Sequence, residues 1–221
     1  MNRITVFRTP PRIVMGPGAI GRIPQEVSEL KAEKVLFVTD KGIIGALDMI
    51  RREKADLVIG FGGGSPIDIA KAGAIMATNE GTIADFFGVD MIPKPGLPTL
   101  IVPTTAGTGS EATPIAILSD EGEKLKKGIV SPYLMPSVAV IDPELTLGLP
   151  PDITASTGTD ALIHAIEAYT SVNATDMTDI LAFRAMELLY ENIRTAYANG
   201  NNLKARSCMM EGSLLAGIAF A

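Results

Sequence analysis

Residues 55–71 read ADLVIGFGGGSPIDIAK, and this stretch decides the fold. Its apolar start, residues 57–59, has the length of a buried strand. Three glycines come next, and without side chains they allow a sharp bend. The residues after them are those that a helix start prefers, with Ser65 as the cap, Pro66 at the first helical position and Asp68 in the first turn. The stretch therefore predicts a strand, a bend and a helix N-terminus in direct succession.

A bend of bare backbone in front of a helix N-terminus is suited to hold an anion. A phosphate can come close to such a chain, and the unpaired N–H groups of the first helical turn point at it. An ordinary tight strand-to-helix turn is the simpler alternative. The three consecutive glycines, Gly62, Gly63 and Gly64, joined to a cap, a proline and an acid, favour phosphate binding. Their spacing is not the GxGxxG of the usual dinucleotide fingerprint.

Composition and charge narrow the classes of function. Of 221 residues, 47% are hydrophobic and 20% charged, as in soluble globular proteins. The net charge is −6 and basic residues cluster only in pairs such as Arg51-Arg52, so nothing argues for a nucleic-acid surface. The single cysteine, Cys208, allows no internal disulfide, and no apolar run reaches transmembrane length or forms a secretory leader. We expect a cytoplasmic protein that binds neither nucleic acid nor a membrane.

Strand and helix signals alternate through the first two thirds of the chain. Buried strands are expected at residues 34–38, 57–59, 99–102 and 137–141, helices at 19–30, 47–54 and 67–78, and a hairpin within 113–130. This alternation is typical of an α/β domain with a parallel sheet.

The pattern breaks at Leu149-Pro150-Pro151, and everything after it has helical spacing. We therefore place a domain boundary there, with an α/β domain over residues 1–149 and an all-helical domain over 150–221. The last helix ends in SLLAGIAFA without a cap, and its apolar face is expected to lack a cover within this chain. That face and an exposed N-terminal strand together suggest association, with a homodimer as the simplest form.

Polar residues follow two of the expected strands at the end where ligands bind in open α/β sheets. Asp40 comes after strand 34–38, where a carboxylate commonly takes the ribose hydroxyls of a dinucleotide and disfavours NADP relative to NAD. A turn former or helix cap is an equally open reading of Asp40. After strand 99–102 the loop PTTAGTGSE offers hydroxyl groups suited to a ribose, amide or phosphate. An ordinary polar loop is the alternative there.

In the helical part, Asp160 and His164 are four residues apart and so lie on one helix face. A carboxylate oxygen and an imidazole nitrogen one turn apart can both bind a single divalent metal ion. A surface pair, or a histidine satisfied in the core, is the alternative, because two ligands do not make a site.

Four motifs taken together resemble one family. GGGSPIDIAKA, PTTAGTGSE, IVSPYLMPSVAVIDPEL and TGTDALIHAIEAYTS, in this order, are similar to the iron-containing (group III) alcohol dehydrogenases over essentially the whole chain. The resemblance implies a Rossmann-like N-terminal domain that binds NAD(P) and an all-helical C-terminal domain. It also implies a divalent metal in the cleft between them, usually iron and in some members zinc. Members interconvert alcohols with aldehydes or ketones, so a small alcohol or aldehyde is the implied substrate.

The resemblance also implies a role for each matching residue. Asp40 matches the residue that faces the adenosine ribose and selects NAD. The pyrophosphate loop is matched by Gly62, Gly63, Gly64, Ser65 and Asp68. The second cofactor loop is matched by Thr104, Thr105 and Thr108, and the lysine near the nicotinamide ribose by Lys126. Asp160 and His164 match the first two metal ligands, which carry the catalytic role of holding the alcohol oxygen through the metal.

The chain departs from the family pattern in two ways. The family uses two further histidines downstream as metal ligands, whereas this chain has one histidine in total. Relative to the family pattern, we also expect some tens of residues to be missing after about Gly45, along with the C-terminal part. Because catalytic metals usually have at least three protein ligands, we expect the chain alone to bind metal weakly and to turn over alcohols slowly. A non-catalytic or fragmentary nucleotide-binding member is the alternative, with a dehydroquinate-synthase-like or polyol enzyme as a further one.

Overall fold

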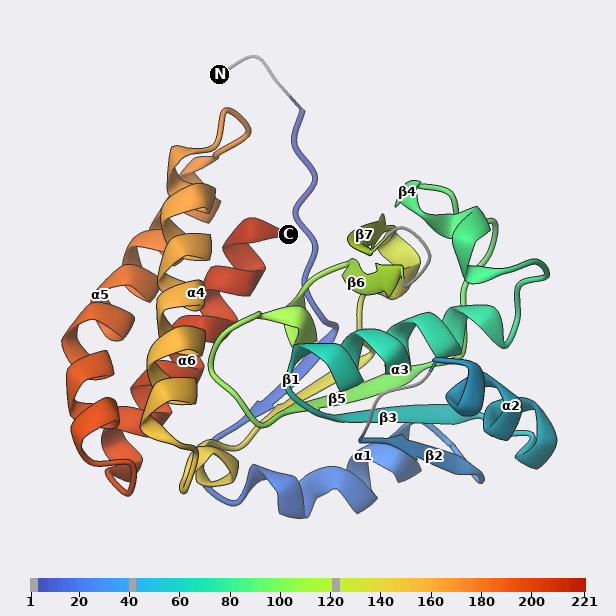
Figure 1. The fold of residues 1–221 in the computed structure, drawn as a ribbon, viewed down its shortest axis with the longest axis horizontal. Helices are drawn as coiled ribbons and strands as arrows, with labels where there is room; N and C mark the ends of the chain where they lie inside the picture. The colour runs from blue at the N-terminus through green and yellow to red at the C-terminus, as the bar shows by residue number, and fades with distance from the viewer. Residues whose placement is uncertain (1–3, 40–42, 121–123) are drawn as a thin grey trace.

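The computed structural model describes residues 4–39, 43–120 and 124–221. A parallel sheet with helices on both faces fills one side of the molecule, and helices α4, α5 and α6 form a layer at its other end (Figure 1). The expected fold class, a Rossmann-like α/β domain followed by an all-helical domain, is confirmed.

The main sheet is parallel throughout, and within the described residues it has five strands in the order β1-β8-β5-β3-β2. The central strands are fully buried because helices cover both faces. Gly62 at the end of β3 pairs with Pro103 at the end of β5, so the loops after these two strands start side by side. The strands are β1 (Arg12–Met15), β2 (Val35–Val38), β3 (Leu57–Gly62), β5 (Thr99–Pro103) and β8 (Val138–Ile141).

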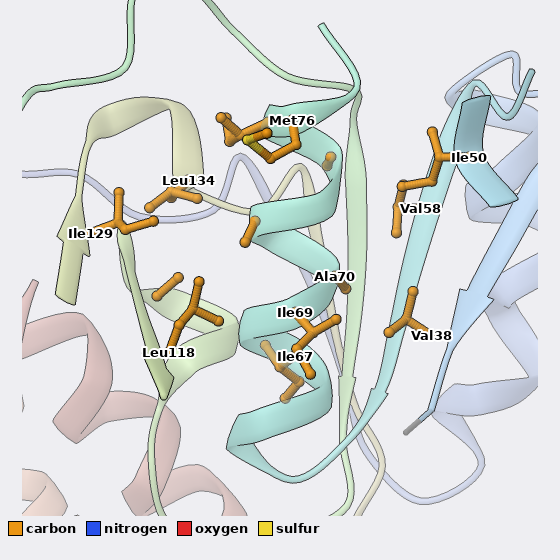
Figure 2. Packing of buried hydrophobic residues seen from close by; sticks show 14 of the residues in the cluster. Val38, Ile50, Val58, Ile67, Ile69, Ala70, Met76, Leu118, Ile129 and Leu134 are labelled. Carbon is orange, nitrogen blue, oxygen red and sulfur yellow. The ribbon is translucent and has the colours of Figure 1, made fainter. Parts of the chain in front are cut away.

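The two faces of the sheet pack against different helices. In Figure 1 the short helix η1 (Ala19–Arg22) and α1 (Ile23–Glu29) lie below the sheet, and α3 (Gly64–Met76) lies above it. Side chains of a strand alternate between faces, so Leu57 and Ile59 contact the α1 layer while Val58 contacts α3. Ile50 of α2 (Ile43–Glu53) joins the α3 side of the core (Figure 2).

A smaller sheet packs against the outer side of α3. Strands β6 (Ile115–Asp120) and β7 (Leu125–Val130) pair antiparallel, which confirms the expected hairpin, and β4 (Gly88–Val89) adds a short parallel edge. Leu118, Ile129 and Leu134 point from this side toward α3 (Figure 2). Helix α3 is therefore enclosed between two sheets. Short 3-10 turns connect these elements: η2 (Ile83–Phe86), η3 (Ser110–Ala112), η4 (Pro132–Leu134) and η5 (Pro143–Thr146).

The last helix is the core of the helical layer. Helix α6 (Leu203–Phe220) packs against α4 (Pro151–Thr170) and α5 (Asp176–Ala198) and also against η3 and η5. Met209, Met210, Leu214 and Ile218 are all buried, so the expectation of an uncovered apolar face is wrong. The two preceding helices and the loops of the α/β part supply the partner that the sequence pattern alone does not reveal.

The predicted boundary between residues 149 and 150 lies between η5 and α4, and it stays a prediction. One apolar cluster includes residues from both sides of it. Ala106 and Ile141 from the sheet side share that cluster with Ala161 of α4 and Leu214 of α6. Within the ranges that the structure describes, no helix combines the length and apolar content that crossing a membrane requires.

Candidate cofactor and metal site

The glycine bend, residues 62–64, turns the chain from β3 into α3 without a side-chain cap. Gly62 has a φ of +143°, a conformation that favours glycine, and extended Gly63 is the N-cap residue. The helix starts at Gly64, so the prediction of Ser65 as cap and Pro66 as first helical residue is wrong. The glycine geometry completes the turn earlier than the capping pattern suggests, and exposed Ser65 lies inside the first turn. Among the described residues the N-terminus of α3 has no side-chain cap, so its first N–H groups can receive an anion.

The threonine loop, residues 104–109, lies against this bend. The Thr104 N–H donates to the Gly62 carbonyl at 2.8 Å. A Cβ placed on Gly63 would be 3.6 Å from Thr105 Oγ1, and one on Gly64 would be 2.7 Å from Thr108 Cγ2. The structure therefore brings six predicted cofactor residues together with Ser65 at the carboxyl ends of β3 and β5: Gly62, Gly63, Gly64, Thr104, Thr105 and Thr108.

The other predicted cofactor residues are placed differently. Asp68 is only 7% exposed, and its carboxylate accepts from the Ser110 hydroxyl at 2.5 Å and the Ile117 N–H at 3.0 Å. Burial raises the pKa of Asp68, against the pull of Lys71 and these hydrogen bonds. Asp68 thus faces the protein interior and ties α3 to the chain after the threonine loop. Lys126 is exposed on β7, and Asp40 lies outside the described residues.

Two buried charged residues next to Asp68 were missed by the sequence reasoning. Lys71 is 1% exposed and Glu111 is 3% exposed. Burial lowers the pKa of Lys71 to about 8, against the attraction of Asp68 and then of Glu111. Burial raises the pKa of Glu111 to about 7, against a backbone hydrogen bond and the attraction of Lys71. The signal for Lys71 was in the sequence: with Asp68 it is one of two charged residues in an otherwise apolar or neutral helix.

The threonine loop also touches the helical layer through two of its glycines. A Cβ on Gly107 would be 2.8 Å from Thr157 Cβ of α4. Gly109, at a φ of +61°, meets Gly217 of α6 so closely that a Cβ on it would be 2.6 Å from the Gly217 Cα. These glycines therefore let the loop pack backbone to backbone against the helices, which the sequence reasoning did not anticipate.

The predicted metal pair lies on α4. Asp160 and His164 are one turn apart, with 3.9 Å between Asp160 Oδ1 and His164 Nε2, and their side chains are 49% and 25% exposed. The His164 ring faces the Phe220 ring of α6 at a centroid distance of 5.0 Å. Thr157 precedes His164 by two turns on the same face of α4, so the threonine loop meets the helix face that carries the pair.

The donor set for a metal is incomplete in the described part of the chain. There, no group of three or more histidine, cysteine, aspartate or glutamate side chains could hold a metal ion. Catalytic ions usually have three protein ligands and one open position. Asp160 and His164 fit the chemistry of a divalent ion as two donors, but they do not by themselves make a site.

Family profiles match most of the chain. The profile described as "Iron-containing alcohol dehydrogenase" matches residues 43–143, and the one described as "Fe-containing alcohol dehydrogenase family, C-terminal" matches residues 154–221. The chain belongs to the iron-containing alcohol dehydrogenase family. This membership confirms the resemblance.

Named relatives agree with the family. A sulfoacetaldehyde reductase of Bilophila wadsworthia is 41% identical over 97% of this chain and 65% of its own length. A crystal structure of 1,3-propanediol oxidoreductase has a TM-score of 0.95 at 37% identity, covering 99% of this chain and 66% of that one. A sulfoacetaldehyde reductase from Bifidobacterium kashiwanohense, solved in complex with NAD+, has a TM-score of 0.91 at 31% identity, covering 99% and 67%.

The chain is shorter than these members of the family. It spans 65% of the length of the Bilophila relative. The alignment with that relative extends over 250 positions although this chain has 221 residues, so the relative carries internal residues that this chain lacks.

Proposed function

We propose that this chain binds NAD between the glycine bend and the threonine loop and serves the interconversion of a small alcohol with its aldehyde or ketone. The observation that carries the proposal is the contact between the uncapped N-terminus of α3 and the threonine loop, at the carboxyl ends of two paired parallel strands. Nicotinamide supplies the hydride chemistry when it is bound, and the protein supplies binding and orientation.

The residues of the site divide the work of holding NAD. The backbone of the glycine bend admits the pyrophosphate, and the first N–H groups of α3 meet its negative charge. Half-buried Thr104 and Thr105 and exposed Thr108 offer hydroxyl groups to the phosphates or the ribose. We further propose that Asp40 takes the adenosine ribose and selects NAD, and that Lys126 lies near the nicotinamide ribose.

The cofactor site can be tested by introducing a steric clash at Gly64 and then removing the methyl group that it meets. In Gly64→Ala the new Cβ meets Thr108 Cγ2, so the threonine loop must shift, and we expect NAD affinity to fall at least tenfold in calorimetric titration. Combining it with Thr108→Ser removes that methyl group and should restore part of the lost affinity. Equal affinity of Gly64→Ala and the unmodified chain would contradict a cofactor site between these loops.

For the metal, we propose Asp160 and His164 as two donors to one divalent ion, with Fe2+ favoured by the family and Zn2+ as the alternative. A bound ion acts as a Lewis acid on the alcohol oxygen. In this chain the carboxylate and the imidazole lie one turn apart and 3.9 Å from each other, so both would hold the ion from one helix face.

Two donors, with no third beside them in the described part of the chain, predict weak metal binding. We expect less than one equivalent of Fe2+ or Zn2+ after dialysis, and slow NADH formation from simple alcohols. His164→Ala should abolish the residual metal binding, while Glu167→Ala, on the same exposed helix face, should not change it. Stoichiometric metal with ordinary turnover would refute this prediction.

A second candidate function is NAD binding without catalysis, favoured by the same incomplete donor set. Binding of NAD without turnover in the presence of Fe2+ supports it over the dehydrogenase.

We also propose a cytoplasmic location, consistent with the lone Cys208, and a homodimer through the exposed extended segment that includes Ile4 and Val6. A monomeric mass in sedimentation at micromolar concentration would sink the dimer.

A further inference from the structure

Lys71 is a buried cation whose bonds all go to one segment of the chain. Its side chain is 1% exposed, and its Nζ donates to the carbonyl groups of Ser110 at 2.9 Å, Thr113 at 2.8 Å and Ile115 at 2.5 Å. The Ser110 hydroxyl lies at 3.2 Å as a fourth acceptor. An ammonium has three protons, so three converging carbonyl groups satisfy it.

Asp68 lies one turn before Lys71 on α3 and binds the same segment, but it accepts hydrogen bonds where Lys71 donates them. Its carboxylate accepts from the Ser110 hydroxyl and from the Ile117 N–H. One turn of α3 thus fixes both the carbonyl and the N–H groups of residues 110–117. Glu111, also buried, adds a third titratable group that attracts the ammonium.

This anchor lies directly after the threonine loop. At the near end of the loop, the Thr104 N–H is bound to the glycine bend. At the far end, Ser110 is bound to Lys71 and Asp68. Residues 105–109 are therefore held between two fixed points, and both points belong to the β3–α3 unit that forms the anion site.

We propose that Lys71 is a positioning residue of the cofactor site, which sets the place of the threonine loop by gathering the carbonyl groups of Ser110, Thr113 and Ile115. The ligand it serves, NAD, rests on the function proposed above. Lys71 itself is too deeply buried to touch a ligand, so its effect is exerted through the loop. Burying a lysine among neutral acceptors is unfavourable in free energy. The buried ammonium nevertheless has a structural role, because it fixes the geometry of the loop.

The test compares two buried cations. Lys71→Met removes the ammonium that donates to the three carbonyl groups. Arg206→Met is the matched control, because Arg206 is 2% exposed and donates to the carbonyl groups of Gly200 and Leu149 and to the Thr154 hydroxyl, in the helical part. Both variants should lower the unfolding temperature. Amide exchange of residues 104–117 is measured without NAD, and NAD affinity by calorimetry below both unfolding temperatures.

We expect Lys71→Met to speed amide exchange in residues 104–117 at least tenfold and to weaken NAD binding at least tenfold. Arg206→Met should change both quantities less than twofold. Unchanged exchange at residues 104–117, unchanged NAD affinity, or equal effects of the two variants would overturn the proposal. If the unmodified chain binds no NAD, the proposed function fails, and the exchange comparison alone decides whether Lys71 fixes the loop.

Ser110→Ala keeps the proposal testable if Lys71→Met does not fold. This variant removes the hydroxyl between Lys71 and Asp68 but leaves the ammonium and its carbonyl acceptors in place. We expect about threefold weaker NAD binding and faster exchange in residues 104–117, because the bonds of the Ser110 hydroxyl to Lys71 and Asp68 are lost while the bond of Lys71 to the Ser110 carbonyl remains. Values equal to those of the unmodified chain would overturn the proposal.

Discussion

Replacing Gly217 with alanine is expected to destabilise the protein by about 3 kcal/mol, although such a change inside a helix normally stabilises it. The new Cβ would lie 2.7 Å from the Gly109 carbonyl oxygen and 2.8 Å from the Gly109 Cα. Both are backbone atoms and cannot rotate away, so α6 and the threonine loop must separate. Because α6 is also the buried centre of the helical layer, a shift of this helix disturbs its packing on α4 and α5.

Gly45 provides the matched control for this prediction. It is exposed in α2, and a Cβ placed on it meets nothing within 4 Å. Gly45→Ala should therefore stabilise the protein by up to about 1 kcal/mol, the usual gain from helix propensity. The two free energies of unfolding, measured by urea titration with a common slope, are expected to change in opposite directions. A Gly217→Ala variant as stable as Gly45→Ala would contradict the contact between α6 and the loop.

Local signals in the sequence were enough for the glycine bend, the hairpin and the alternation of strands and helices. Each depends on a few neighbouring residues: the apolar run at residues 57–59, three glycines, and a period of two or of 3.6. The helix cap at Ser65 failed because Gly62 and Gly63 adopt backbone conformations that start the helix before the capping residue. Glycine freedom thus outweighed a good capping pattern.

Contacts between distant segments were beyond the same reasoning. Lys71 and Ser110 are brought together by the fold, and the sequence showed only an unusual lysine in an apolar helix. Gly109 in a turn and Gly217 in a helix can each be explained locally. Only the tertiary packing shows that the two backbones are in close contact, so that neither position has room for a Cβ. The burial of α6 likewise depends on helices and loops that are not adjacent to its apolar positions in sequence.

The titration of Glu111 and Lys71 is expected to give the free energy of unfolding a minimum between about pH 7 and pH 8. Burial raises the pKa of Glu111 to about 7 from 4.5. Between these values the folded chain holds a proton that the unfolded chain has released, so stability falls as the pH rises. Burial lowers the pKa of Lys71 to about 8 from 10.5, so above pH 8 the unfolded chain holds the extra proton and stability rises with pH.

Each of the two pKa changes corresponds to a change in unfolding free energy on the order of 3 kcal/mol across its own range of pH. Urea unfolding at pH 5, 7.5 and 9.5 measures both. Asp68, whose pKa is also raised by burial, adds to the decrease at the acid end of the range. The neutral isostere in Glu111→Gln should remove most of the decrease between pH 5 and 7 and leave the increase above pH 8.

Lys71→Met provides the complementary result. Since the variant has no ammonium to deprotonate, its stability should no longer rise between pH 8 and pH 10, while the decrease below pH 7 remains. The charges facing Lys71 are Asp68 on its own helix and Glu111 on η3, and the exposed Lys126 on β7 acts on Asp68. If the free energy of unfolding of Lys71→Met still rose fully above pH 8, another group would have to cause that rise. The burial of the Lys71 ammonium would then not be what lowers stability near neutral pH.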